Sequence, residues 1–147
     1  MNQSFVLLTL AAAVQASVKI MTPPYTATGS EIAIVWVGGA HYDASDYMSI
    51  ALAFQQAAAA QGLKAWVGIP QFTFDIPKPK LLDGSIQDSV KQLKAAGYTG
   101  DEWFLAAHSL GGFMAQDFLT NGATDSTLFK AQALMGSVLD RKKVSIQ

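Results

Sequence analysis

Short apolar runs alternate along the chain with longer stretches in which apolar residues recur every three or four positions. The runs have the length of strands, and the periodic stretches have the length of amphipathic helices. Strands are predicted over residues 17–21 (a short edge strand), 31–37, 63–69, 102–107 and 130–138, and helices over 46–61, 84–96 and 110–120. This alternation predicts an α/β fold: a mostly parallel sheet with about four central strands and helices on both faces.

Capping residues and prolines set the expected boundaries. Asp43 to Asp46 offers N-caps for the first helix, and Asp83 is the expected N-cap of the second. Tyr47, Ala51, Phe54 and Ala58 fall on one face of the first helix, so we expect them in the core. Residues 71–82 hold two of the five prolines and follow a third, Pro70; they are predicted to form a loop, in which Phe72 and Phe74 either line a pocket or anchor the loop to the core.

The junction between the strand at 102–107 and the helix at 110–120 is crowded with small residues around Ser109. Ala107 lies two positions before this serine, and Gly111 and Gly112 lie two and three positions after it. A turn this sharp needs small neighbours, and it exposes the serine hydroxyl in a strained conformation. The backbone N–H of Leu110 would open the helix unpaired and point toward an oxyanion formed at Ser109.

Residues 107–111, Ala-His-Ser-Leu-Gly, resemble the nucleophile elbow of the α/β-hydrolase family in an Ala-x-Ser-x-Gly form. The resemblance implies that Ser109 is a nucleophile and that Leu110 supplies one oxyanion N–H. It also implies that the loop after the strand at 31–37, Gly38-Gly39-Ala40-His41, supplies the second, assigned to Ala40 with His41 as the alternative at the pocket edge. The alternative for both segments is structural: a plain glycine-rich turn, and an ordinary strand-to-helix turn with Ser109 as N-cap.

The rest of a hydrolase triad is incomplete in this sequence. The family order is serine, then an acid, then a histidine, yet no histidine follows Ser109. Asp140 follows the last predicted strand, where some members carry the acid; the alternative is an exposed charge beside two basic residues. His108 is expected to point away from Ser109, because side chains alternate along a strand, and to pack locally. The resemblance therefore covers the first half of a hydrolase domain.

Residues 1–16 resemble a secretory signal peptide, which would leave a partial hydrolase domain over 17–147. The apolar stretch from Phe5 to Val14 has the length of a signal core and is too short to span a bilayer. Val14-Gln15-Ala16 then offers a small-residue cleavage site, although Met1-Asn2-Gln3 carries no Lys or Arg. The alternative is a buried first strand. The signal predicts a secreted or endomembrane-lumen protein without a transmembrane segment.

Composition narrows the classes of partner. The formal net charge is −1 without a basic run, so neither nucleic acid nor an anionic membrane surface is an expected partner. The chain has no cysteine and two histidines, so no disulfide and no metal site are expected. The glycine pair Gly38-Gly39 lies outside any GxGxxG or GK[ST] pattern, which argues against a nucleotide site. The family resemblance implies no cofactor.

These observations favour a secreted serine hydrolase acting on a carboxylic-ester or lipid-ester small molecule, with the C-terminal acid and histidine missing from these residues. The alternative is a non-catalytic binding or interaction protein on a truncated hydrolase scaffold. The strand at 130–138 has the pattern of a central strand without a following partner, and such an edge is a liability. A partner chain or a dimer covering this open edge is therefore also expected.

Overall fold

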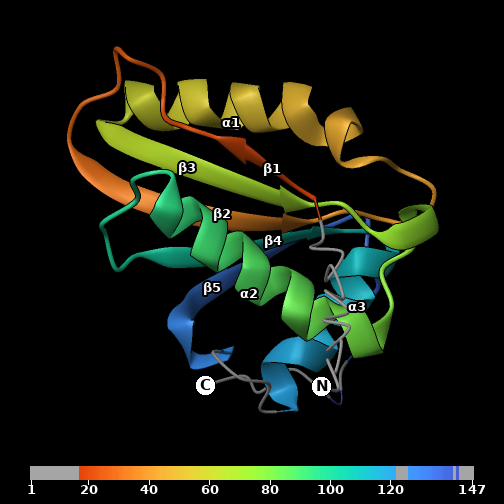
Figure 1. Ribbon diagram of the computed structural model, residues 1–147. Coiled ribbons are helices and arrows are strands. Elements are labelled where there is room, and N and C mark those ends of the chain that lie inside the picture. The colour runs from red at the N-terminus through yellow and green to blue at the C-terminus, as the bar shows by residue number, and fades with distance from the viewer. Residues whose placement is uncertain (1–16, 122–125, 141, 143–147) are drawn as a thin grey trace, which may run out of the picture.

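The computed structural model describes residues 17–121, 126–140 and 142; the predicted signal peptide at 1–16 lies outside them. One five-stranded sheet organises the fold, with the strand order β1-β3-β2-β4-β5 (Figure 1). Its strands are β1 (Val18–Met21), β2 (Ser30–Val37), β3 (Leu63–Pro70), β4 (Trp103–His108) and β5 (Phe129–Met135). Strands β2 to β5 pair in parallel, and β1 is antiparallel to β3. The predicted fold class is confirmed.

Helices cover both faces of the sheet (Figure 1). α1 (Met48–Ala60) packs on one face, and α2 (Pro79–Ala95) and α3 (Leu110–Thr120) pack on the other. Because side chains alternate along a strand, Val35 and Val37 of β2 join the core under α2 and α3, whereas Ile34 and Trp36 join the core under α1. None of the helices among the described residues is long and apolar enough to cross a membrane.

Two predicted boundaries were wrong. α2 begins at Pro79, with Lys78 as its N-cap, so Asp83 lies inside the helix and does not cap it. Proline suits the first helical turn because its missing N–H has no intrahelical acceptor there. The buried face of α2 already includes Leu82, before the predicted helix start at residue 84. The last strand ends at Met135, three residues before the predicted end at Val138.

The two phenylalanines before α2 have different environments. Phe72 is buried in the core under α2 and α3, so it anchors the loop. Phe74 is 80% exposed and has a left-handed backbone with φ 58°. The structure therefore confirms that Phe72 anchors the loop to the core, which was one of the two roles expected for these side chains.

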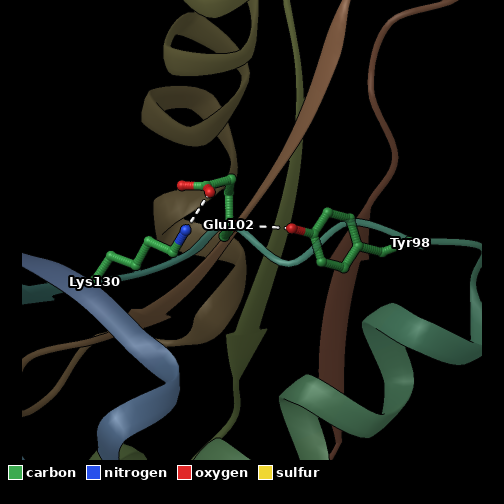
Figure 2. A network of polar contacts seen from close by, with 3 residues as sticks. All are labelled: Tyr98, Glu102 and Lys130. Atoms are coloured by element: carbon green, nitrogen blue, oxygen red, sulfur yellow. Dashed lines mark hydrogen bonds and ion pairs between the residues drawn. The ribbon is translucent and has the colours of Figure 1, made fainter.

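The entry into β4 is fixed by polar contacts on both sides of Glu102 (Figure 2). The buried Tyr98 hydroxyl donates to the Glu102 carbonyl oxygen at 2.8 Å, and burial raises the pKa of Tyr98 to about 12. The Glu102 carboxylate pairs with Lys130 of β5. These contacts lie at the end of β4 opposite to Ser109.

The face of the sheet under α1 is only partly covered. α1 packs against β3, and β5 forms the outer edge of the sheet. An apolar groove of about 480 Å³ runs beside α1 over β2, β4 and β5, lined by residues that include Ile34, Phe54, Ala57, Phe104 and Ala133. We refer to this feature as the open-face groove.

Candidate active site

Ser109 lies between the last residue of β4 and the first residue of α3, with φ 50° and ψ −124°. Positive φ is rare for a residue with a side chain, and sparsely populated backbone conformations cost about 1–3 kcal/mol each. Its side chain makes no capping hydrogen bond to α3. Ser109 therefore occupies the N-cap position without the cap interaction that would explain a serine there, and it is half-buried in a strained turn.

Glycine is required on the helical side of this turn. A Cβ on Gly111 would lie 2.2 Å from the Gly38 carbonyl oxygen and 2.8 Å from that of Val37. A Cβ on Gly112 would lie 2.5 Å from the side chain of Ser137. The first turn of α3 is thus packed directly against the end of β2, as expected of the small residues in this stretch.

The loop after β2 lies directly against Ser109. A Cβ on Gly39 would come within 3.1 Å of the Ser109 Cβ and 2.9 Å of His108 Nδ1. β2 and β4 are neighbouring parallel strands, with Val37 opposite Ala107, so the residues after each strand meet at the same edge of the sheet. This edge is where open α/β sheets bind ligands.

Hydrogen bonds hold the N–H groups on both sides of Ala40 in this loop. The N–H of Gly39 donates to the Tyr47 hydroxyl at 2.7 Å, and the N–H of His41 donates to the Asp75 carbonyl oxygen at 2.7 Å. Between them, the N–H of Ala40 has no acceptor among the described residues. The N–H of Leu110, the first residue of α3, likewise has no partner in the described part of the chain. Two unpaired N–H groups therefore lie in the two segments that flank Ser109.

The loop is braced from its far side by the connection between β3 and α2. Gln71 accepts a hydrogen bond from the N–H of Ala44 at 2.8 Å and donates one to the Asp75 carboxylate at 2.6 Å. Asp75 and His41, which meet through their backbones, both have positive φ, at 54° and 65°. Two strained loops are thus held together at the site.

A cleft of about 550 Å³ opens beside the elbow on the α1 face, and His41, Tyr42, Tyr47, His108 and Met135 are among its lining residues. His108 is half-buried, with Nδ1 2.9 Å from the Tyr47 hydroxyl and its ring edge-on to that of Tyr42. His41 is exposed. Neither histidine forms a hydrogen bond with the Ser109 hydroxyl within the described residues.

Asp140 follows β5, whose carboxyl end lies at the same edge of the sheet as that of β4. Its N–H donates to the buried Gln116 side chain of α3 at 2.9 Å, and its carboxylate accepts from the N–H of Lys142 at 3.1 Å. The structure therefore brings Ser109, Leu110, Ala40 and His41 to one edge, with Asp140 tied to α3 beside it. Nowhere in the described residues do three His, Cys, Asp or Glu side chains gather as metal ligands.

Tyr47 is the site residue that sequence reasoning missed. Its helical spacing with Ala51 and Ala58 correctly indicated burial, and its side chain is 7% exposed. The spacing carried no sign that its hydroxyl would meet Gly39 and His108. Burial raises the pKa of Tyr47, so the phenol stays protonated and keeps its donor.

No family model and no curated protein matches this sequence. Among solved structures, a fluorophosphonate-binding serine hydrolase of Staphylococcus aureus superposes with a TM-score of 0.60 at 16% identity, over 86% of this chain and 53% of its own. The chain has part of the α/β-hydrolase fold. The poly(3-hydroxybutyrate) depolymerase of Bordetella parapertussis gives 0.56 at 16% identity, over 86% of this chain and 54% of its own. A monoglyceride lipase of Saccharomyces cerevisiae gives 0.54 at 14% identity, over 85% and 42%.

The chain spans about half the length of the three proteins. At these identities the likeness concerns the fold. The arrangement of Ser109 and its neighbours is therefore the basis on which chemistry is proposed below.

Proposed function

We propose that this chain carries the nucleophile half of a serine ester hydrolase, with Ser109 as the nucleophile. The observation that carries the proposal is the strained backbone of Ser109, at φ 50° and ψ −124°, beside the N–H groups of Leu110 and Ala40, which have no partner among the described residues. Strain of this kind persists where the surrounding structure enforces it, and it clusters at functional sites.

The reaction follows from this arrangement. The Ser109 hydroxyl oxygen attacks the carbonyl carbon of an ester as a base takes its proton, and the N–H groups of Leu110 and Ala40 stabilise the negative oxygen. The intermediate collapses, the alcohol leaves with a proton, and water hydrolyses the acyl-enzyme. The proposal assigns the base to a histidine that these 147 residues do not contain and keeps Asp140 as the candidate acid.

The same proposal also covers the class of substrate and the cellular location of the protein. One structural neighbour is named a monoglyceride lipase and another a poly(3-hydroxybutyrate) depolymerase. On this likeness we extend the proposal to carboxylic-ester and lipid-ester substrates. Secretion rests on the apolar stretch of residues 1–16, and a partner chain or second copy would cover the open-face groove.

A fluorophosphonate probe tests the nucleophile directly, because it forms a covalent bond with an activated serine. Because the base is missing from these residues, we expect slow labelling of the folded wild-type chain, driven by the strained serine and its neighbouring N–H groups, and none of Ser109→Ala. Ser45→Ala is the matched control, since Ser45 is an exposed serine in the short turn before α1 and should leave labelling unchanged. Equal labelling of wild-type and Ser109→Ala protein would overturn the assignment of Ser109.

The second candidate function is a non-catalytic binding protein on this scaffold. It is favoured by one observation: neither His41 nor His108 forms a hydrogen bond with Ser109 among the described residues, and a serine without a base is a weak nucleophile. This function predicts that well-folded wild-type protein, verified by circular dichroism, is not labelled at all.

A further inference from the structure

Three segments meet at one hydroxyl group: two lie eight residues apart in sequence, and the third is sixty-one residues from Tyr47. Tyr47, in the short turn before α1, receives the N–H of Gly39 from the loop after β2 at 2.7 Å. The same oxygen lies 2.9 Å from Nδ1 of His108, the last residue of β4. A Cβ on Gly39 would come within 3.1 Å of the Ser109 Cβ and 2.9 Å of His108 Nδ1, and His108 immediately precedes Ser109 in the chain. The hydroxyl therefore joins the glycine loop to the elbow.

The direction of the second hydrogen bond follows from counting donors. Tyr47 has one proton to donate, and its oxygen already accepts from Gly39. If His108 Nδ1 carried the proton, the Tyr47 proton would have no acceptor among the described residues, and an unmatched buried hydroxyl is costly. Tyr47 therefore donates to an unprotonated Nδ1, and the proton of neutral His108 is on Nε2.

The ring of Tyr47 has a separate, structural task. It lies in the core under α1, with its centroid 6.2 Å from that of Trp36, and leaves no room for a Cβ on Gly38, which would fall 2.8 Å from its Cε2. A phenylalanine would keep these contacts and lose only the hydroxyl. The effect of the Tyr47 hydroxyl can thus be measured separately from the packing of its ring.

We propose that Tyr47 is a positioning residue whose hydroxyl fixes the glycine loop against the elbow and holds His108 as the Nε2–H tautomer. The inference rests on the proposed function for its catalytic consequence. With Gly39 tied to Tyr47 and His41 tied to Asp75, the intervening N–H of Ala40 has little freedom to move relative to Ser109. Preorganised donors of this kind act without reorganisation during the reaction.

Tyr47→Phe is the test, and Tyr98→Phe is its matched control. Tyr98 is also a buried tyrosine that donates one hydrogen bond, but it acts at the opposite end of β4 (Figure 2). Nitrogen-detected NMR at about pH 8, where an ordinary imidazole is neutral, reports the His108 ring. We expect a hydrogen-bonded, unprotonated Nδ1 in wild-type and Tyr98→Phe protein, and a shift toward an unbonded nitrogen in Tyr47→Phe.

Two further measurements report on the hydrogen bond of the glycine loop and on the reactivity of Ser109. Exchange of the Gly39 amide proton should speed up about tenfold in Tyr47→Phe, as expected for the loss of roughly 1.4 kcal/mol of hydrogen bonding. Fluorophosphonate labelling of Ser109 should slow by roughly ten- to a hundredfold, since a misplaced donor costs up to that factor. Tyr98→Phe should leave both rates unchanged.

The outcomes separate this inference from the proposed function. A protonated Nδ1 in the wild type, or a His108 spectrum and Gly39 exchange unchanged by Tyr47→Phe, would overturn the positioning role. Equal labelling rates in wild-type and Tyr47→Phe protein would also overturn it. Absence of labelling in every variant refutes the reactive serine, while the NMR and exchange results still decide whether Tyr47 holds the loop and His108.

Discussion

Ser109 keeps its strained backbone because residues on both sides leave it no other arrangement. Its N–H donates to the Met135 carbonyl oxygen at 2.9 Å, and its own carbonyl accepts from the N–H of Gly112 at 3.0 Å. Gly111 then brings α3 against the end of β2. The strain is therefore offset by contacts from two other strands, which is the condition for such a conformation to persist.

Gly111→Ala tests this close approach. The added methyl group would fall 2.2 Å from the Gly38 carbonyl oxygen, so α3 must move away from β2. We expect the free energy of unfolding to fall by about 1–3 kcal/mol or more, as for other overpacked sites, and Ser109 labelling to slow. Urea unfolding monitored by circular dichroism measures the first effect.

Gly84→Ala is the matched control for that change. Gly84 lies inside α2, and a Cβ added there would have no heavy atom within 4 Å outside its own helical turn. Alanine is a better helix former than glycine, so this variant should gain about 0.5–1 kcal/mol. Similar unfolding midpoints for the two variants would contradict the steric argument.

Helix α1 is held to the sheet through a buried polar side chain as well as by apolar packing. Gln55 is 2% exposed, and its Nε2 donates to the carbonyl oxygens of Met21, Thr22 and Ala65 at 3.2, 2.9 and 2.8 Å. These carbonyls belong to the end of β1, the residue after it, and β3. The Gln55 side chain thus links α1 to both the edge strand β1 and its neighbour β3.

Gln55→Leu should destabilise the chain by about 1–3 kcal/mol, because it leaves partly buried carbonyl oxygens without their donor. Gln56→Leu is the control, since Gln56 is exposed on the same helix. Its effect should stay within about 0.5 kcal/mol. Chemical denaturation of both variants checks the difference, and equal losses would show that Gln55 is not a structural tie.

At the scale of the whole molecule, the sheet is covered unevenly. α2 and α3 cover one face, whereas α1 leaves the open-face groove above β4 and β5. β5 also lies at the outer edge of the sheet. Exposed apolar grooves and free strand edges promote association, which is why a partner chain or second copy is part of the proposed function.

Sedimentation velocity of the wild-type chain over a range of concentrations should detect self-association through this surface. Ala57→Glu places a charge in the groove and should weaken association about tenfold or more, because burying an unpaired charge is costly. Ala53→Glu, on an exposed part of α1 outside the groove lining, should have little effect. A wild-type chain that remains monomeric at every concentration would contradict association through a second copy.

The fold and much of the candidate site were accessible from sequence because they depend on local patterns. Short apolar runs predicted the strands, period-three-to-four hydrophobicity predicted the helices, and the small residues around Ser109 predicted a crowded turn. The start of α2 was missed because it falls inside residues 77–80, Pro-Lys-Pro-Lys, a composition that is also typical of a loop. Proline at the first helical position was the signal that could have corrected it.

By itself, the sequence determined the order of the elements, the parallel sheet and the position of the serine turn, since these follow from neighbours along the chain. Only the tertiary structure decided which groups meet at that turn. The bond from Gly39 to the Tyr47 hydroxyl, the contact of that hydroxyl with His108 sixty-one positions away, and the free N–H of Ala40 among the described residues all depend on how β2, β4 and the turn before α1 pack together. Hydrophobic periodicity places an aromatic ring in the core, but it does not specify the partner of a hydroxyl at the end of that ring.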